Sequence, residues 1–584
     1  MGQHSTTMVG AGGWINELRS GIAGSGNPGG LLIGEGQGGR GGNFTEFFFR
    51  KESEARPFFS STWPSNEKAR SMVFFYHDNH NERLRMHTIR EYFLDLLNTR
   101  GDTSGYHPMH RLVTLFAFFV LGNLSAASEK PNIVFINADD LGWGDLGFMG
   151  SGYYETPHLD RLAASGIVFT HAYAAAANCA PSRASVYSGQ TTSRHGVLTV
   201  GDPARGRAEH RRLIPPPNKE HLDPAIPTFP KLMQQAGYQT IHVGKWHIGD
   251  DPTQAGFDVN IGGTKWGHPV NGYFSPYRIP GFEDGPKGEY LTERLAHDTV
   301  NAINDLDAEK PFLISMQFYS PHTPIQAKAE KIAHFEAKKP TPFHSDPVYA
   351  AMISHLDDAV GEILAALEAR ELLENTVVIF TSDNGGIHQI SDQSPLRGEK
   401  GSYYEGGIRV PLAIRWPGKT APGTRSDIPV TGLDFFPTFL ELAGITPPEG
   451  HETDGDSLVP MLTGGPSLPK DRELFWHFPA YLQAYGRGNA TTRDPLFRTR
   501  PCSIVRVGPW KLHEYFEDGG LELHHLTSDP GERRNVASLF PEKTQQLHEA
   551  LLAWRTRVAA PMPEGRNPAF DAEAEAAAIR ARID

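Results

Sequence analysis

Short apolar runs alternate with helical patterns along most of the chain, and this alternation limits the possible folds more than any other feature. Runs with the composition of buried strands lie at residues 132–138, 167–170, 240–244, 311–318, 376–381 and 410–415. Patterns typical of helices lie between them, at residues 157–166, 229–237, 291–305 and 349–373. Strands that alternate with helices form a mostly parallel sheet with helices on both faces. The sequence therefore predicts an α/β fold with a large, doubly wound sheet.

The pattern changes beyond about residue 465. Short strand-like runs at residues 503–508, 510–513 and 521–524 follow one another closely, and a helical run follows at residues 542–558. Closely spaced short strands pair as an antiparallel sheet, and its apolar face needs a cover. We therefore place a large domain at residues 128–465. A smaller antiparallel α+β subdomain with a helical tail occupies residues 466–584.

The first part of the chain has a different character. Residues 1–108 are rich in glycine at first and show no sustained periodicity. Residues 109–127 then have a methionine, a positive residue, an apolar core and a small-residue ending, which is the layout of a secretory signal peptide. We predict cleavage after Ala127 and treat residues 1–108 as an upstream extension, mis-annotated or disordered. The alternative is a genuine extension with an internal anchor.

Charge and cysteine content narrow the function classes. The formal net charge of −13 argues against nucleic acid as a partner, because a phosphate backbone attracts a basic surface. Cleavage of the signal peptide would deliver a periplasmic or secreted protein without a stable membrane anchor. The two cysteines, Cys179 and Cys502, could form a disulfide in such a protein, or each could remain a buried thiol.

Acidic and amide side chains follow two of the predicted strands. Asp139 and Asp140 come directly after residues 132–138, and Asp383 and Asn384 come soon after residues 376–381. The carboxyl ends of parallel strands meet at one edge of a sheet, so these oxygens are expected to lie together. Such a set suits a hard cation, Ca²⁺ before Mg²⁺. The alternative for either pair is simple capping of a strand end.

Cys179 belongs to a second group of candidate functional residues. It begins the sequence Cys-Ala-Pro-Ser-Arg, which follows a run of small residues and reads as a loop entering a helix. Pro181 falls in the first turn, where its missing N–H costs nothing. A side chain at a helix N-terminus faces unpaired amides and the positive end of the helix dipole, which favours anions.

Other cationic and histidine side chains also lie near the ends of predicted strands. Lys245 and His247 follow residues 240–244, and His322 follows residues 311–318. Lys400 lies in a glycine-containing loop. Taken alone, each could be an ordinary loop residue.

Taken together and in this order, these motifs resemble the type I, formylglycine-dependent sulfatases of the alkaline-phosphatase-like superfamily. The resemblance runs from about residue 132 to about residue 411 and continues more weakly beyond. It implies that a formylglycine-generating maturation enzyme oxidises Cys179 to an aldehyde, whose hydrate is the nucleophile. A cysteine with that fate must stay unpaired, which argues against the disulfide.

The resemblance also implies a role for each residue in the group. The metal ligands would be Asp139, Asp140, Cys179, Asp383 and Asn384. The catalytic set would be Cys179, Arg183, Lys245, His247, His322 and Lys400. Lys245 and Lys400 would clamp the sulfate, and Arg183 would hold the hydrated aldehyde. His322 would be the general acid for the leaving oxygen, and His247 the base that later expels sulfate.

The substrate is expected to be a sulfated carbohydrate. Loops at residues 263–268, 476–479 and 497–500 mix aromatic, histidine and arginine side chains that suit sugar rings and anions, although each could equally be domain packing. We assign substrate contacts to Lys245, His322, Lys400 and His477. The alternatives are an aryl sulfatase, a phosphatase or phosphonate hydrolase on the same fold, and a non-catalytic carbohydrate-binding relative.

Overall fold

The structure, a computed structural model, describes residues 130–485 and 492–583 and the backbone of five strands between residues 33 and 88. The chain divides into two compact units, Met1–Ala127 and Ser128–Asp584. In the first unit, an antiparallel sheet has the order β1-β2-β3-β4-β5, with bounds Ile33–Gly38, Gly42–Phe47, Phe58–Ser61, Val73–His77 and Leu84–Thr88. Residues 109–127 lie outside the described residues, so the signal peptide and the status of residues 1–108 stay predictions.

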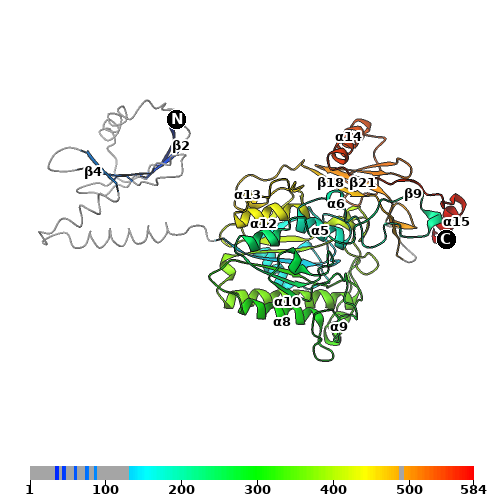
Figure 1. The fold of residues 1–584 in the computed structure, drawn as a ribbon, viewed down its shortest axis with the longest axis horizontal. Coiled ribbons are helices and arrows are strands. Elements are labelled where there is room, and N and C mark those ends of the chain that lie inside the picture. Colours follow the sequence, from blue (N-terminus) through cyan, green and yellow to red (C-terminus); the bar gives the residue numbers. More distant parts are fainter. Residues whose placement is uncertain are drawn as a thin grey trace. The chain divides into compact units, whose positions relative to one another are not determined.

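An eight-stranded sheet forms the centre of the second unit (Figure 1). Its order is β11 (Val259–Ile261), β10 (Gln239–Gly244), β12 (Phe312–Gln317), β6 (Asn132–Ala138), β13 (Thr376–Ser382), β15 (Leu412–Arg415), β7 (Ile167–Phe169) and β16 (Thr424–Ser426). The first five strands are parallel, whereas β15 runs antiparallel to both of its neighbours. The register places Val134 of β6 opposite Ile314 and Val378. The predicted large, mostly parallel sheet is confirmed.

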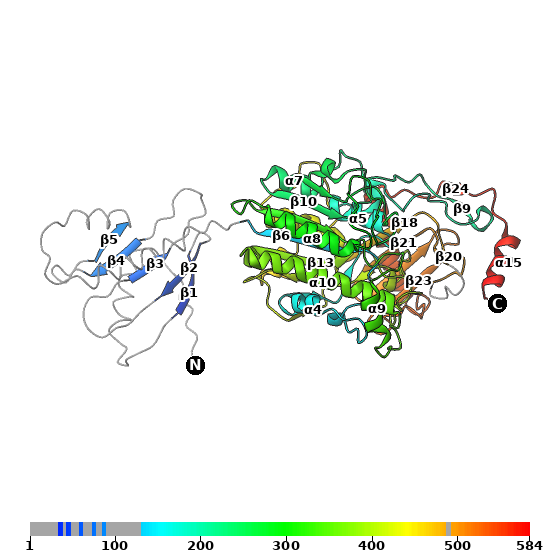
Figure 2. The same cartoon turned by 90° about the horizontal axis from the view of Figure 1, so that it is seen from below.

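Helices cover both faces of this sheet (Figure 2). One face packs against α4 (Pro157–Ala164), α8 (Leu291–Asn304) and α10 (Pro347–Ala369), with α9 (Ala329–Glu336) beside α10. The other face packs against α5 (Cys179–Ser188), α7 (Phe229–Gln235) and α12 (Phe435–Ala443). Successive side chains of a strand point to opposite faces, so Val134 and Ile136 join one core and Ile133 and Phe135 the other. Both faces are buried, which explains why β6 is apolar throughout.

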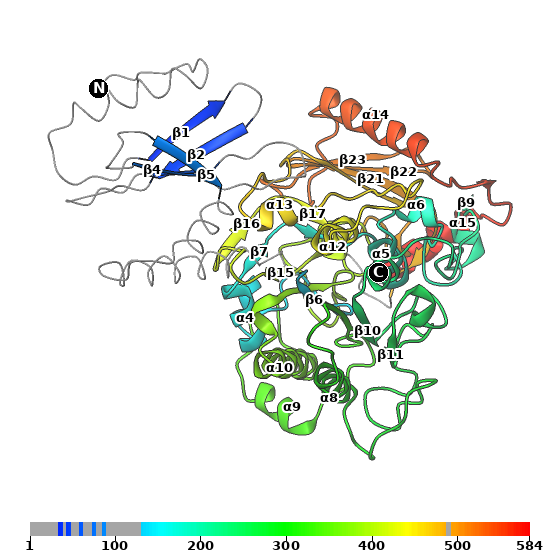
Figure 3. The same ribbon diagram turned by 60° about the vertical axis from the view of Figure 1, so that its left-hand side comes forward.

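A smaller antiparallel sheet follows in the chain (Figure 3). Its order is β18 (Glu473–Phe478), β21 (Cys502–Val507), β22 (Trp510–Tyr515) and β23 (Leu521–His525). On one face, Leu551 and Trp554 of α14 (Pro541–Arg557) pack against Val505 and Leu512. On the other face, Ile504 joins a core with residues of the large domain, including Tyr173. The predicted antiparallel subdomain is confirmed.

Short elements complete this unit. The helices are α6 (Thr192–His195), α11 (Glu405–Ile408), α13 (Val459–Leu462) and α15 (Ala572–Ile583), with 3-10 turns at Gly147–Met149, Ala208–His210, Pro252–Ala255, Leu373–Asn375 and Gly432–Asp434. The strands are β8 (Ala172–Tyr173), β9 (Leu213–Ile214), β14 (Arg409–Val410), β17 (Val430–Thr431), β19 (Leu482–Gln483), β20 (Phe497–Thr499) and β24 (Gly565–Arg566). Among the described residues, none of the helices combines the length and the apolar character that crossing a membrane requires.

Candidate active site

The acidic residues predicted at the strand ends do meet. β6 and β13 are parallel neighbours, so Asp139 and Asp140 lie beside Asp383 and Asn384. The Asp140 backbone N–H donates to Asp383 Oδ1 at 3.3 Å, and Asn384 Nδ2 donates to Asp140 Oδ1 at 2.8 Å. All four residues are at most 4% exposed. The topology alone brings together side chains that lie more than 240 residues apart.

Two lysines enter this group. Lys245 Nζ lies 2.6 Å from Asp139 Oδ2, and neither side chain is exposed. Lys400 Nζ lies 2.7 Å from each oxygen of Asp140. We call the whole set the strand-end cluster: Asp139, Asp140, Lys245, Asp383, Asn384 and Lys400.

Burial and charge act in opposite directions on the two aspartates that follow β6. Burial raises the pKa of Asp139 well above its ordinary value, and Lys245 only partly offsets this. Burial also opposes ionisation of Asp140, but Lys400 and then His322 outweigh it and lower its pKa. Asp140 is therefore the firmly ionised member of the pair.

Arg183 holds one side of the cluster in place. Its Nε donates to Asp383 Oδ2 at 2.9 Å, and its Nη1 donates to Gln317 Oε1 at 2.8 Å and to the Lys245 carbonyl at 3.2 Å. Gln317 is not among the site residues predicted from the sequence. Its signal was a polar residue at the end of the buried strand β12, at the same edge of the sheet as Asp139.

Cys179 is the first residue of α5 and is 4% exposed. The preceding residue, Asn178, is extended, so the chain enters the helix at Cys179, as predicted. Burial opposes the charged form of Lys400, but Asp140 and then Cys179 outweigh it and raise its pKa. The Gly401 backbone N–H donates to the Ala177 carbonyl at 2.8 Å, so the loop that carries Lys400 packs against the segment that leads into Cys179. Both cysteines are free, and burial raises the pKa of Cys502 to about 12. The disulfide alternative is therefore wrong for this structure.

The two predicted histidines are largely buried, close to the lysines. His322 Nε2 is 3.6 Å from Asp140 Oδ2, and its Nδ1 is 2.7 Å from the Thr323 carbonyl. That carbonyl can only accept, so Nδ1 carries a proton. Burial lowers the pKa of His322 and of His247 well below the ordinary value. For His322 the next cause is Lys400, and for His247 it is Lys245.

The loop at residues 263–268 closes over these histidines. The His247 backbone N–H donates to the Thr264 carbonyl at 2.9 Å. A Cβ on Gly267 would lie 2.3 Å from His247 Cε1, so the close approach requires glycine. The exposed His268 ring stacks on His322 with centroids 6.5 Å apart. His247 and Asp140 both have left-handed backbone, with φ of 68° and 63°, which costs about 1–3 kcal/mol per residue unless the surroundings enforce it.

The strand-end cluster fits a hard cation. Among the described residues, Asp139 Oδ1 and Asn384 Oδ1 are buried acceptors that receive no hydrogen bond. Buried polar atoms are nearly always paired, because leaving one unpaired costs about 1–3 kcal/mol. Ligand atoms of Asp139, Asp140 and His322 also lie within 4.8 Å of one another. An oxygen-rich set with unpaired acceptors suits Ca²⁺ or Mg²⁺.

The structure does not bring His477 to this site. His477 lies in β18, is 1% exposed, and has both ring nitrogens engaged, Nδ1 with Ser503 Oγ at 2.7 Å and Nε2 with the Pro561 carbonyl at 2.8 Å. A buried ring without a free nitrogen cannot contact a substrate, so that prediction is wrong. The neighbouring Trp476 donates to the Ala174 carbonyl, so the loop at residues 476–479 is domain packing.

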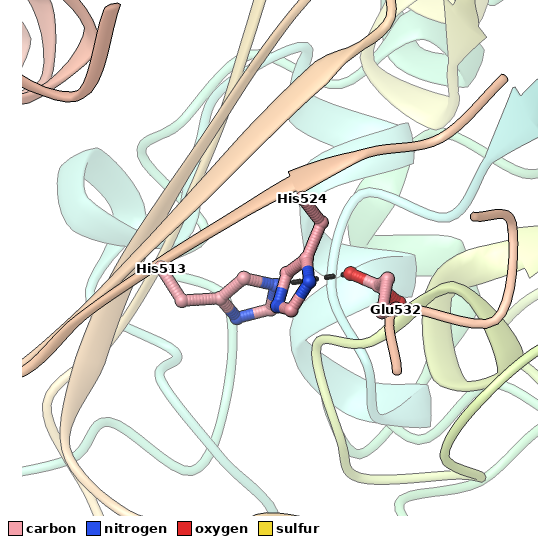
Figure 4. Close-up of side chains that lie close together, drawn as sticks. All are labelled: His513, His524 and Glu532. Atoms are coloured by element: carbon pink, nitrogen blue, oxygen red, sulfur yellow. Dashed lines mark hydrogen bonds and ion pairs between the residues drawn. The ribbon is translucent and has the colours of Figure 1, made fainter. Parts of the chain in front are cut away.

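A second buried charge cluster lies between the small sheet and α11. Figure 4 shows two of its members, His513 and Glu532, beside His524. Lys511 Nζ lies 2.9 Å from Glu405 Oε1 and 3.0 Å from Glu532 Oε1. His513 Nε2 lies 3.1 Å from the same Glu532 oxygen, and the Glu405 backbone N–H donates to Glu532 Oε2. We call Glu405, Lys511, His513 and Glu532 the C-terminal cluster. The adjacent His524 completes a histidine–acid group, but Glu532 has no free oxygen to offer a metal.

The comparisons with known proteins agree with this fold. The Sulfatase family model matches residues 131–445, and a model described as N-sulphoglucosamine sulphohydrolase, C-terminal, matches residues 398–557. A protein named Sulfatase from Formosa agariphila is 33% identical over 515 residues, covering 74% of this chain and 90% of the relative. N-acetylgalactosamine-6-sulfatase from Homo sapiens is 32% identical over 479 residues, covering 73% and 87%.

Solved structures share the same architecture. The crystal structure of Ps i-CgsB in complex with k-i-k-neocarrahexaose superposes with a TM-score of 0.60 and 27% identity, covering 78% of this chain and 98% of that chain. The chain belongs to the sulfatase family and is a sulfuric ester hydrolase.

Proposed function

We propose that this sulfatase hydrolyses a sulfate ester on a sulfated carbohydrate, with a formylglycine made from Cys179 as nucleophile and with one bound calcium ion. One observation carries the proposal. Cys179 begins α5, the segment before it packs against the Lys400 loop, and the strand-end cluster retains two buried oxygens that no described residue pairs. The carbohydrate is supported by the relatives, which include N-acetylgalactosamine-6-sulfatases and a protein solved with a carrageenan-type hexaose.

The charges of the site favour an anionic substrate once a cation is present. The three carboxylates of the strand-end cluster are matched by three cationic side chains, Lys245, Lys400 and Arg183. A calcium ion would be held by Asp139, Asp140, Asp383, Asn384 and residue 179. When bound, it would polarise the sulfate oxygens and the nucleophile. Its two positive charges would exceed the balance and attract a sulfate monoester.

The surrounding side chains would bind the sulfate and orient the nucleophile. Lys245 and Lys400 hold the non-bridging oxygens of the sulfate in a water-poor site, where each hydrogen bond is worth most. The formylglycine hydrate supplies the attacking hydroxyl. Arg183 orients residue 179, because its guanidinium is itself fixed by Asp383 and Gln317.

Two histidines move the protons. His322 donates a proton to the leaving oxygen, and His247 removes one from the second hydroxyl, so that sulfate is expelled and the aldehyde re-forms. Burial, followed by Lys400, lowers the pKa of His322 in the free protein. The negative charge of a sulfate beside Lys400 would offset that cation, raise the pKa and favour the protonated form.

The proposal includes export and maturation. The signal-peptide pattern at residues 109–127 supports a periplasmic or secreted protein, and a cysteine at position 179 requires a formylglycine-generating enzyme as partner. Fractionation of the expressing cells, with N-terminal sequencing of the mature protein, tests the export. A mature chain that begins at Ser128 is the expected result.

Peptide mass spectrometry across Cys179 tests the core of the proposal. Co-expression with the maturation enzyme should remove roughly 18 mass units, because an aldehyde replaces the thiol. Only the modified fraction should hydrolyse N-acetylgalactosamine 6-sulfate or carrageenan oligosaccharides. An unmodified thiol despite active maturation would contradict the proposal and favour a binding protein. Turnover of 4-nitrophenyl sulfate alone would favour an aryl sulfatase. Two tightly bound zinc ions with phosphate-ester hydrolysis would favour a phosphatase.

A further inference from the structure

Arg498 is a buried cation without a counterion. It lies in β20 and is 6% exposed, yet no carboxylate among the described residues lies within ion-pair distance of it. Its hydrogen bonds go to two backbone carbonyls, from Nε to Gln483 at 3.1 Å and from Nη1 to Lys400 at 3.1 Å. By contrast Arg500, two residues further, pairs with Glu517 at 2.7 Å and Glu575 at 2.8 Å. A buried charge is costly unless it is paired, so Arg498 calls for an anion from outside the chain.

The neighbours of Arg498 place that anion beside the candidate active site. The hydrogen bond to the Lys400 carbonyl joins the guanidinium to the residue whose ammonium contacts Asp140. A Cβ on Gly401 would lie 2.4 Å from Leu482 Cδ2 and 3.1 Å from Arg498 Nη1, so glycine lets the Lys400 loop pack closely against the guanidinium. The guanidinium stacks on Tyr485, with Cζ 3.8 Å from the ring centroid. Stacking fixes the plane of the guanidinium, and among the described residues its Nη2 has no hydrogen-bond acceptor and can donate to an anion.

A second arginine, Arg205, adds positive charge near Arg498. Arg205 is half-buried, donates to the Val200 carbonyl at 2.8 Å and has no carboxylate partner among the described residues. Burial is the main reason why the pKa of Arg498 is lowered; Tyr485 and Glu399 partly offset it, and Arg205 lowers it further. An anion bound at Arg498 would also be attracted by Arg205.

We propose that Arg498, supported by Tyr485 and Arg205, forms a second anion subsite that binds a sulfate or carboxylate group of the substrate other than the ester sulfate that is cleaved. The inference rests on the proposed function and narrows it to glycans that carry a second anionic group, on the same sugar or on its neighbour. Arg498 determines specificity here, because it binds the substrate without touching the reacting atoms.

Binding to the calcium-loaded Cys179→Ala protein tests the subsite without turnover. Calorimetry would compare N-acetylgalactosamine 6-sulfate, N-acetylgalactosamine 4,6-disulfate and the chondroitin 6-sulfate disaccharide, which adds a uronate carboxylate. At least one doubly charged ligand should bind about 10-fold more tightly than the monosulfate, equal to about 1.4 kcal/mol. Arg498→Gln should abolish that gain and change the monosulfate affinity by less than about twofold. The ligand that shows the gain identifies the second anion as sulfate or carboxylate.

A matched variant separates the subsite from general effects of charge. Arg493 also stacks on a tyrosine, at 4.2 Å from the Tyr515 ring, but it pairs with Asp518. Arg493→Gln should leave all three affinities unchanged. Arg498→Lys keeps the charge but loses the fork, so it should retain only part of the gain. Thermal melts establish that each variant is folded.

Three outcomes would overturn the inference. The first is that Arg498→Gln binds the doubly charged ligands as tightly as its parent does. The second is that it loses the same factor for all three ligands, which would mean that Arg498 only supports the Lys400 loop. The third is that the parent protein gains nothing from a second charge. Turnover of 4-nitrophenyl sulfate by the matured protein reports separately on the proposed sulfatase function.

Discussion

The strand-end cluster and the C-terminal cluster are built from similar parts and differ in one respect. Both bury carboxylates against lysine ammonium groups, and both join segments that lie far apart in the chain. In the C-terminal cluster every carboxylate oxygen has a donor, since Glu405 binds Lys511 and Tyr173 while Glu532 binds Lys511, His513 and the Glu405 N–H. In the strand-end cluster, Asp139 Oδ1 and Asn384 Oδ1 have none among the described residues.

We interpret this difference as that between a structural cluster and a candidate binding site. Charge alone does not distinguish the two, because in each the acidic and basic side chains face each other in ion pairs. A cluster whose acceptors are all paired is complete and holds the small sheet against α11. A cluster with unpaired buried oxygens is incomplete without a ligand. We therefore expect substitutions in the strand-end region to affect turnover and metal binding, and substitutions in the C-terminal cluster to affect stability.

The largest effect is expected at Cys179. Cys179→Ala removes the proposed nucleophile and should lower kcat by about 10³-fold or more, since the remaining groups cannot replace covalent catalysis. The melting temperature should change by no more than a few degrees. Cys502→Ala is the matched control, because Cys502 is equally buried but belongs to β21. That variant should lose stability and keep its activity per folded molecule. Comparable activity of Cys179→Ala and wild type would contradict the nucleophile assignment.

Lys511→Met should have the largest effect on stability. It leaves Glu405 and Glu532 buried without their shared cation, and breaking such a pair costs about 3–5 kcal/mol. Urea denaturation measures the free energy of unfolding. Lys470→Met is the control, because Lys470 forms an exposed pair with Asp427, and its effect should stay within about 0.5 kcal/mol. Equal effects of the two substitutions would show that the C-terminal cluster does not hold the subdomain.

The C-terminal cluster should also make stability depend on pH. Burial lowers the pKa of His513 to about 4, whereas the unfolded side chain titrates near its ordinary value of about 6.5. Between these values the unfolded state binds the extra proton, so the stability from neutral His513 is lost as the pH falls, by up to about 3 kcal/mol. His513→Gln should reduce the slope of unfolding free energy against pH by up to one proton between pH 5 and 7. An unchanged slope would contradict this.

A smaller effect is expected from removing calcium. A ligand at 100 times its Kd stabilises the folded state by about 2.7 kcal/mol, so chelation should lower the unfolding free energy by about that much, and added Ca²⁺ should restore it. Asp383→Asn should reduce the gain in unfolding free energy on adding Ca²⁺, because it removes one carboxylate of the strand-end cluster. Lys511→Met should respond to calcium as the wild type does. If only Lys511→Met lost the response to calcium, the ion would bind at the C-terminal cluster and the prediction would be wrong.

Several features of the candidate site followed from local pattern. An apolar strand that ends in Asp-Asp or Asp-Asn identifies the carboxyl edge of the sheet, and neighbouring parallel strands bring those ends together whatever their separation in the chain. The position of Cys179 at a helix N-terminus could also be predicted, because a small-residue run before Cys-Ala-Pro indicates where a helix begins. Gln317 shared the same signal at the end of β12, yet a single amide at a strand end has too many ordinary uses to be singled out.

Other residues could not be assigned from sequence, because their partners come from remote segments. His477 was expected at the substrate, but the pairing of β18 with β21 places it beside Ser503, inside the packing of the small sheet. Arg498 and Arg500 lie two residues apart in one candidate loop. Only the fold sends Arg500 to Glu517 and Glu575 and leaves Arg498 beneath Lys400.

The sequence by itself determined the alternating α/β architecture, the acidic strand ends and the helix that begins at Cys179. Each of these follows from periodicity or from residues adjacent in the chain. The tertiary structure decided which buried polar groups are paired and which are not. That distinction depends on donors contributed across hundreds of residues, and it assigns the C-terminal cluster to stability and leaves the strand-end cluster and Arg498 open to ligands.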